Sequence, residues 1–529
     1  MSQKILVGGA WPYANGSLHI GHLAGLLPGD VIARYHRAIG NDVYYVSGSD
    51  CHGTPVSIRA RQEKVSPETI SDRYHDEFVS IFNKLGFSYD VYGKTSQEEH
   101  KEFVKKFHKK LYKSAYVYGK VSRKAFCEHC NQFLADRFVE GTCPKCGEAA
   151  RGDQCEVCGA VLEPESLEAP SCALCGNTPI LRRTKHIYMT LSQLKDELQN
   201  LVDTHENWRK NAIAFTNRYI SEGLRERALT RDLDVGIDAP KEGYEDKKIY
   251  IWAENVLGYL SMSELAVKQR GGNPEELWKE ENVRHYYIHA KDNIPFHTII
   301  LPALLIAEGS GYHLPDDIIS NEYQTLEGKK ISTSQNHAIW LKDMVDKYNP
   351  DAIRYFFLIN GPEKRDTDFS WPEFVRSNNG ELLGAYGNFV NRSLVFIEKY
   401  FGGEVPEGSL DSEIKKEILT IYERVGEKIA AGHLKDALEQ IFAFIRKCNK
   451  YFDGREPWLT KTTDVQSCQD TLYTCIQMIA NLSILLKPFL PFSSEKIQDW
   501  LDIKNTWEYV TVNAGYTLQQ SEILFKRLD

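Results

Sequence analysis

The sequence predicts an α/β protein, with a doubly wound parallel sheet that is interrupted by a cysteine-rich insertion and followed by an all-helical region. Three observations support this class. An apolar run at residues 5–10 ends in a turn and helix-forming sequence, which is how a strand–helix unit of a parallel sheet begins. Four Cys-x-x-Cys pairs are concentrated between residues 127 and 175. From about residue 379 onward, apolar residues recur at helical spacing.

Length and composition describe a globular protein of several domains. A chain of 529 residues exceeds the size of one core, so about three domains are expected. No uninterrupted apolar run reaches the about 18 residues that cross a membrane, and no signal peptide precedes the first strand, so we expect a cytoplasmic protein. The net charge of −9 argues mildly against a nucleic-acid partner, although an acidic chain can still carry a basic face.

The stretch 11–22 connects the first predicted strand to the first predicted helix. Ser17 is expected to cap that helix. His19 and His22, three residues apart, share one helix face as potential cationic donors, and Gly21 leaves the backbone open to a ligand. A helix N-terminus with these features is typical of a phosphate site. The competing interpretation is that both histidines are packing residues.

Two more stretches place polar groups where a parallel sheet binds ligands. The apolar strand 41–50 ends at Asp50, a candidate partner for a cationic group, with simple turn formation as the alternative. The loop 326–334 is rich in Gly, Ser and Thr, so that Lys330 can close over a phosphate, although such loops are more often only solvated. Between these stretches, residues 66–112 have helical periodicity.

The eight cysteines of the insertion have the spacing of zinc ligands: Cys127, Cys130, Cys143, Cys146, Cys155, Cys158, Cys172 and Cys175. Two Cys-x-x-Cys pairs supply the four thiolates of one tetrahedral zinc ion, so eight thiolates make two sites. Because protein ligands fill every position, both ions are expected to be structural. Spacing leaves two arrangements open, neighbouring pairs together or an inner site nested within an outer one. Reduced cysteines without metal are the less favoured alternative.

The stretch 11–22, with its His-Ile-Gly-His ending, resembles the first signature of the class I aminoacyl-tRNA synthetases, and its methionyl-tRNA synthetase version in particular. Residues 330–334 resemble the second signature. The resemblance covers essentially the whole chain and implies a Rossmann-type catalytic domain, a zinc-knuckle insertion with nested pairing, and a helical anticodon-binding domain. The implied divisions are 1–115 and 231–340 for the catalytic halves, 116–230 for the insertion, 341–378 for a connective segment and 379–529 for the helical domain.

The resemblance also implies a reaction: the chain activates L-methionine with ATP to methionyl-adenylate and transfers it to the 3′ end of tRNA(Met), with Mg²⁺ on ATP and two structural Zn²⁺ ions. The implied catalytic residues are His19, His22 and Lys330. The implied ATP-binding residues are His19, Gly21, His22, Asp292, Lys330 and Thr333. The implied methionine-binding residues are Tyr13, Asp50, Trp252, Tyr259 and His297, with Asp50 on the α-ammonium group. A monomer is expected, because the chain ends without the appended domain through which some relatives dimerise.

The chain departs from the common family text in two places. Thr333 stands where the family's second signature, Lys-Met-Ser-Lys-Ser, usually has its second lysine. The phosphate contact that this lysine makes in the family therefore cannot be assigned to this chain. The sequence Glu-Asn-Val-Leu-Gly-Tyr at 254–259 stands where the family commonly has Asp-Ala-Pro-Ile-Gly-Tyr. The residues that form the floor of the methionine pocket in the family therefore cannot be assigned to this chain either.

In the helical region, three residues resemble the anticodon readers of the family. Asn388 and Arg392 are four residues apart and share a helix face, and Trp458 follows a predicted helix end. A helix cap and a core tryptophan are the alternative interpretation. Two other functions also remain open: a class I synthetase for another apolar amino acid, and a zinc-stabilised RNA-binding protein that has lost catalysis.

Overall fold

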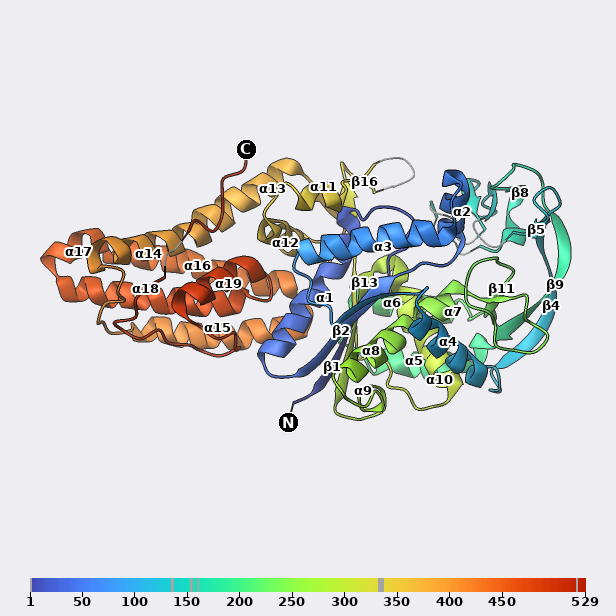
Figure 1. The fold of residues 1–529 in the computed structure, drawn as a ribbon, viewed down its shortest axis with the longest axis horizontal. Helices are drawn as coiled ribbons and strands as arrows, with labels where there is room; N and C mark the ends of the chain where they lie inside the picture. Colours follow the sequence, from blue (N-terminus) through green and yellow to red (C-terminus); the bar gives the residue numbers. More distant parts are fainter. Residues whose placement is uncertain are drawn as a thin grey trace.

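The computed structural model describes residues 2–134, 138–152, 155, 157–158, 160, 162–331, 337–519 and 522–529. The molecule is elongated, with the sheet in the middle, the cysteine-rich insertion at one end and a bundle of helices at the other (Figure 1). This is the predicted order of sheet, insertion and helices. In the described part of the chain, no helix has both the length and the apolarity that a membrane crossing requires.

The central sheet has five parallel strands in the order β14-β13-β1-β2-β3. Their bounds are β1 Lys4–Gly9, β2 Asp42–Ser49, β3 Val91–Lys94, β13 Val283–Ala290 and β14 Asp317–Asn321. After the central β1, the next strands in the sequence, β2 and β3, lie on one side of it, and the later strands β13 and β14 lie on the other. The strand order therefore reverses between β1 and β13, and open α/β sheets bind their ligands at such a reversal.

Both faces of the sheet are buried, which explains why β1 reads as a continuous apolar run. Successive side chains of a strand point to opposite faces, and accordingly Ile5 and Val7 belong to one hydrophobic core while Leu6 belongs to another. The flanking helices include α1 Ile20–Ala38, α2 Thr54–Glu63, α3 Pro67–Lys84, α4 Glu98–Leu111, α8 Gly258–Gln269 and α10 Leu301–Glu308. The helical periodicity expected for residues 66–112 is wrong at β3, whose four residues are too few to show a period of two.

The insertion is built on a long antiparallel ribbon, β4 Val117–Cys127 paired with β9 Ile180–Met189. Its far end carries a three-stranded sheet of β6 Val139–Thr142, β7 Ala149–Arg151 and β8 Glu168–Cys172. Helices α5 Lys195–Asp203 and α6 Lys210–Ser221 then lead back to the central sheet. The insertion thus enters and leaves on neighbouring strands of a separate sheet, so it leaves the pairing of the central sheet uninterrupted.

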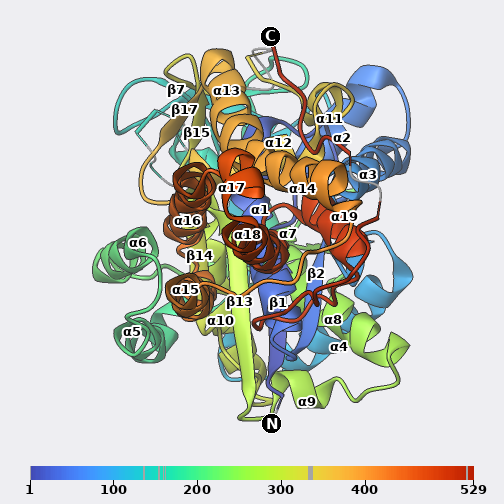
Figure 2. The ribbon, with the colours of Figure 1, turned by 90° about the vertical axis from the view of Figure 1, so that its left-hand side faces the viewer.

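The helical region packs directly on the sheet domain, and Figure 2 looks along the bundle with the sheet behind it. Its helices are α12 Pro350–Ile359, α13 Trp371–Ser377, α14 Asn388–Phe401, α15 Ser412–Ala430, α16 Leu434–Arg455, α17 Pro457–Thr463, α18 Val465–Leu486 and α19 Pro491–Leu501. The expectation of helices to the end of the chain is wrong after Leu501, where the described residues form no further helix.

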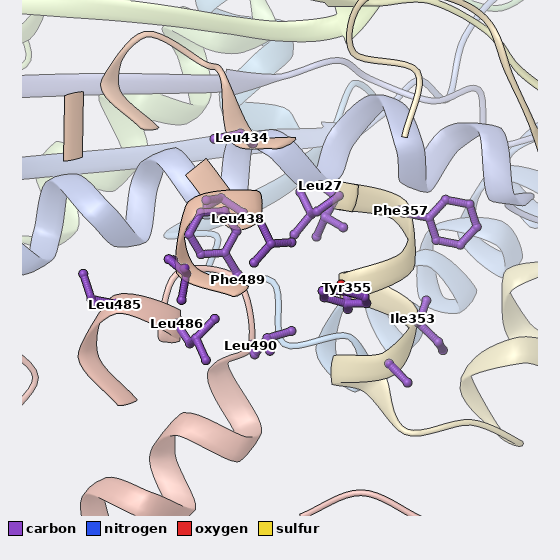
Figure 3. Close-up of a cluster of buried hydrophobic side chains, with 14 of the residues drawn as sticks. Leu27, Ile353, Tyr355, Phe357, Leu434, Leu438, Leu485, Leu486, Phe489 and Leu490 are labelled. Atoms are coloured by element: carbon purple, nitrogen blue, oxygen red, sulfur yellow. The ribbon is translucent and has the colours of Figure 1, made fainter. Parts of the chain in front are cut away.

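A shared core joins the bundle to α1. One cluster of buried side chains includes Leu27 of α1, Tyr355 of α12, Leu438 of α16 and Leu486 of α18 (Figure 3). Next to this core the fully buried guanidinium of Arg354 donates to the Asp30 carboxylate at 2.7 Å and to three backbone carbonyls. Burial alone would raise the pKa of Asp30, but Arg34 and Arg354 lower it to about 2, so this carboxylate is ionised at neutral pH.

Candidate functional site

A cavity of about 710 Å³ opens at the carboxyl ends of β1 and β13. Seven of the predicted site residues line it: Tyr13, His19, Gly21, His22, Trp252, Asp292 and Lys330. They come from stretches far apart in the sequence, and the strand reversal brings them together. Thr333 lies outside the described residues.

The two histidines form the N-terminal cap of α1. His19 is the N-cap residue, and its Nδ1 accepts a hydrogen bond from the backbone N–H of Gly21 at 3.1 Å. His22 Nδ1 in turn accepts from the backbone N–H of His19 at 3.1 Å. The expectation that Ser17 caps the helix is therefore wrong, because this pair of imidazoles moves the cap two residues along, to His19, and the helix begins at Ile20.

The protonation state of these rings follows from the same geometry. Burial lowers the pKa of His19 well below its usual range and the pKa of His22 to about 4, so both rings are neutral at pH 7 in this structure, not cationic as expected. Because each Nδ1 accepts a hydrogen bond, the proton of each neutral ring is on Nε2. The cap therefore presents two N–H donors beside the open N-terminus of a helix, which suits an anionic ligand.

Tyr323, a tyrosine that the sequence analysis missed, also lines the cavity. Tyr323 follows β14, and its ring has the ammonium of Lys291 at 4.1 Å and that of Lys330 at 4.8 Å from its centre. Asp292 lies on the short 3₁₀ turn Lys291–Asn293, directly after β13. Lys330 is exposed on β16, Lys329–Lys330, which pairs with β15, Gln324–Leu326. A single aromatic residue gave no spacing pattern by which to identify it.

Asp50 is buried beside the cavity and is held by an amide from a distant helix. Its Oδ2 accepts a hydrogen bond from the Asn255 side chain at 2.8 Å, and its Oδ1 accepts one from the backbone N–H of His52 at 3.2 Å. Asp50 is 1% exposed, and burial together with the nearby Glu254 carboxylate raises its pKa well above its usual range. Asn255 stands where the common family text has alanine, so this departure was the only sequence signal for its role.

Of the remaining predicted pocket residues, Tyr13 and Trp252 form an aromatic wall next to Asp50. The Tyr13 backbone pairs with Asp50, and the rings of Tyr13 and Trp252 are 6.1 Å apart. Trp252 stacks on Phe296, with ring centres 3.6 Å apart and planes 9° apart. Tyr259 and His297 are almost fully buried and share a hydrogen bond of 2.8 Å between Tyr259 Oη and His297 Nε2. These two residues do not line the cavity as it stands.

The eight cysteines form two groups of four in the nested arrangement. The outer group is Cys127, Cys130, Cys172 and Cys175, and the inner group is Cys143, Cys146, Cys155 and Cys158. Sulfur atoms lie 3.5 Å apart in the pair Cys127–Cys175 and 3.6 Å apart in the pair Cys146–Cys155. Four thiolates at about 2.3 Å from one tetrahedral ion would be separated by about 3.8 Å. Both groups therefore fit a four-coordinate metal with no open position.

The three predicted residues of the helical region lie on neighbouring helices. Arg392 of α14 bonds Asp453 at 2.7 Å and lies over the ring of Phe452, 4.5 Å from its centre. The Asn388 amide lies 3.4 Å from Asn449 of α16. Trp458, on the first turn of α17, is 41% exposed, which excludes the alternative of a core tryptophan.

Comparisons with known proteins agree with this geometry. Residues 5–394 match the family of class I tRNA synthetases (M), and residues 411–524 match the anticodon-binding domain of tRNA ligases. Methionine–tRNA ligase 1 of Alkaliphilus oremlandii is 53% identical over 99% of this chain and 97% of its own length, and the methionine–tRNA ligase of Bacillus mycoides is 51% identical at the same coverage. The fold resembles the Mycobacterium tuberculosis methionyl-tRNA synthetase in complex with methionyl-adenylate, with a TM-score of 0.81, 22% identity and coverage of 99% and 100% of the two chains. The chain therefore belongs to the methionine–tRNA ligase family of class I aminoacyl-tRNA synthetases.

Proposed function

We propose that this methionine–tRNA ligase activates methionine in the cavity between β1 and β13. One group of residues around the cavity binds ATP, and another binds the amino acid. The observation that carries the proposal is the meeting of a histidine-capped helix N-terminus with a buried carboxylate at one strand reversal. The first element suits the phosphates of ATP, and the second suits the ammonium group of an amino acid.

In the first step, a carboxylate oxygen of methionine bonds to the α-phosphorus of ATP, and the bond from that phosphorus to the bridging oxygen breaks, so pyrophosphate leaves. His19 and His22 donate Nε2–H groups to phosphate oxygens, and Lys330 neutralises charge that develops on the leaving pyrophosphate. Asp292 accepts hydrogen bonds from the ribose hydroxyls. Mg²⁺ accompanies ATP and supplies further charge neutralisation on the phosphates.

In the second step, a hydroxyl oxygen of the terminal tRNA ribose attacks the carbonyl carbon of the adenylate. The new ester forms as the bond to the phosphate oxygen breaks, the hydroxyl proton passes to the departing phosphate or to water, and AMP leaves. The substrates supply both the nucleophile and the leaving group in each step. The protein therefore contributes mainly by positioning them and by stabilising the charge that develops. Asp50, fixed by Asn255, holds the ammonium group in both steps.

Selection of methionine rests on the aromatic wall. Tyr13 and Trp252 offer ring edges and faces to a thioether, which packs well on aromatic groups. The hydrogen-bonded pair of Tyr259 and His297 closes the pocket behind them. An amino acid with a branched or shorter side chain fills this space less completely and therefore binds more weakly.

Zn²⁺ is the metal that best fits the two four-cysteine groups, because tetrahedral thiolate sites select it and no open position is left for a substrate. Both ions would therefore stabilise the insertion and take no part in the reaction. Asn388, Arg392 and Trp458 are proposed to contact the anticodon. The domain divisions, the monomeric state, the cytoplasmic location and the phosphate contact at Thr333 stay predictions.

An ATP–pyrophosphate exchange assay with a panel of amino acids tests the proposal. We expect rapid exchange with methionine and little with the other standard amino acids. Equal or faster exchange with leucine or cysteine would identify a synthetase for another apolar amino acid. The absence of exchange with any amino acid, together with retained tRNA binding, would identify an RNA-binding protein without catalysis.

A further inference from the structure

The predicted anticodon residues of α14 continue into a longer strip on the same helix. Asn388, Arg392, Phe396 and Tyr400 are each four residues apart, so they follow one row along α14, and we call them the α14 strip. Twelve residues of helix extend about 18 Å, which is far more than one base covers. At its far end Tyr400 is 43% exposed, about as much as Trp458.

A chain of aromatic rings connects the two exposed side chains. Trp458 of α17 lies 6.1 Å from Phe452 of α16, measured between ring centres. Phe452 lies 6.4 Å from Phe396, and Phe396 lies 4.6 Å from Tyr400. Phe452 is buried, whereas Tyr400 and Trp458 are each partly exposed to solvent. The structure therefore places two stacking surfaces on one continuous aromatic support.

The charge around Tyr400 matches a phosphate backbone. Lys461 of α17 lies 3.7 Å and Lys399 lies 5.2 Å from the centre of the Tyr400 ring. Within the described residues, neither lysine has a carboxylate within salt-bridge distance. The chain as a whole is acidic, with a net charge of −9, so these two lysines without paired carboxylates make the surface around Tyr400 locally positive. Bases stack on aromatic rings while lysines bind their phosphates, which is the usual composition of a single-stranded nucleic-acid site.

We propose that Tyr400, flanked by Lys399 and Lys461, stacks on a second base of the tRNA anticodon loop, distinct from the base that contacts Trp458. This inference rests on the proposed function, because it takes the tRNA substrate as the occupant. Trp458 approaches the middle of the α14 strip through Phe452, whereas Tyr400 stands at its far end, so the two rings would contact different bases of the loop.

Binding of an anticodon stem-loop hairpin tests the proposal, with an abasic nucleotide introduced at each loop position in turn. We expect Tyr400→Ala to weaken binding of the intact hairpin by about five- to 100-fold, the effect of losing one stacked base. Tyr400→Phe keeps the ring and should stay within about twofold of wild type. One abasic position should abolish the penalty of Tyr400→Ala, and a different position should abolish that of Trp458→Ala. Leu419→Ala, which removes an exposed apolar side chain of α15, is the matched control and should bind the hairpin normally.

The outcomes separate this inference from the proposed function. If Trp458→Ala weakens hairpin binding and Tyr400→Ala does not, the second stacking site is refuted and the anticodon assignment stands. If the penalty of Tyr400→Ala is the same with every abasic hairpin, Tyr400 does not stack on a base, and the inference is refuted as well. If wild-type protein binds no hairpin, or exchanges pyrophosphate with no amino acid, the proposed function itself fails.

Discussion

Replacing Asn255 with alanine should weaken methionine binding through Asp50, which Asn255 itself holds in place. The substitution removes the 2.8 Å hydrogen bond to Asp50 Oδ2 and leaves the backbone N–H of His52 as the remaining donor. Hydrogen bonds to charged groups contribute about 1.5–3 kcal/mol. The Michaelis constant for methionine should therefore rise by about ten- to 100-fold, while kcat falls much less.

The pH dependence gives the sharper test. Burial and Glu254 raise the pKa of Asp50, and the Asn255 amide counteracts them, so its loss raises that pKa further. Only the ionised carboxylate attracts the methionine ammonium. As pH falls, a larger fraction of Asp50 in the variant becomes protonated than in wild type. The defect should therefore be largest at low pH and shrink as pH rises.

The assay is ATP–pyrophosphate exchange across about pH 6 to 8.5, with methionine varied at each pH. Asn481→Ala is the matched control, because it removes a fully buried amide from the bundle, where it donates to backbone carbonyls at 2.8 and 2.9 Å. It should lower the melting temperature without changing the Michaelis constant for methionine. A Michaelis constant that is unchanged in Asn255→Ala, or raised equally at every pH, would refute the reasoning.

Three further predictions concern the helix cap, the cysteine groups and the bundle. His22→Ala should slow exchange by about two to three orders of magnitude, the usual loss for one preorganised donor, and an unchanged rate would make His22 a packing residue. Metal analysis should find two zinc ions per chain, and replacing Cys143 and Cys155 with serine should release one of them, whereas one ion or none in the wild-type protein would contradict the count. Trp458→Ala should lower aminoacylation efficiency by about fivefold or more, from about 1–3 kcal/mol of lost stacking, with exchange near wild type. A parallel loss of exchange, aminoacylation and melting temperature would instead indicate a structural role.

The sequence predicted features that depend on near neighbours, and it missed contacts between distant residues. The strand, turn and helix around His19 were correctly placed, because apolar runs and turn residues act locally. The cap residue was not, because a pair of imidazoles that accept from the backbone N–H groups of Gly21 and His19 is a rare substitute for serine. Asn255 is 205 residues from Asp50 along the chain, and no spacing pattern relates them. Among the cysteines, spacing predicted the ligands, while the grouping depends on how the ribbon folds back.

The position of α1 has a mechanical consequence. Its first turn carries His19 and His22, and its last residues contact the bundle, where the backbone N–H of Trp507 donates to Ala38 at 3.0 Å and the ring of Trp507 packs on Tyr35 at 5.0 Å. A helix of 19 residues is about 28 Å long, so a rigid tilt about its bundle end would move its first turn beside the cavity. Tilting it by about 2° would displace the histidines by about 1 Å, and a misplacement of that size can cost about 100-fold in rate. A tRNA that rotated the bundle by a small angle would therefore change the position of His19 and His22 relative to the phosphates of ATP.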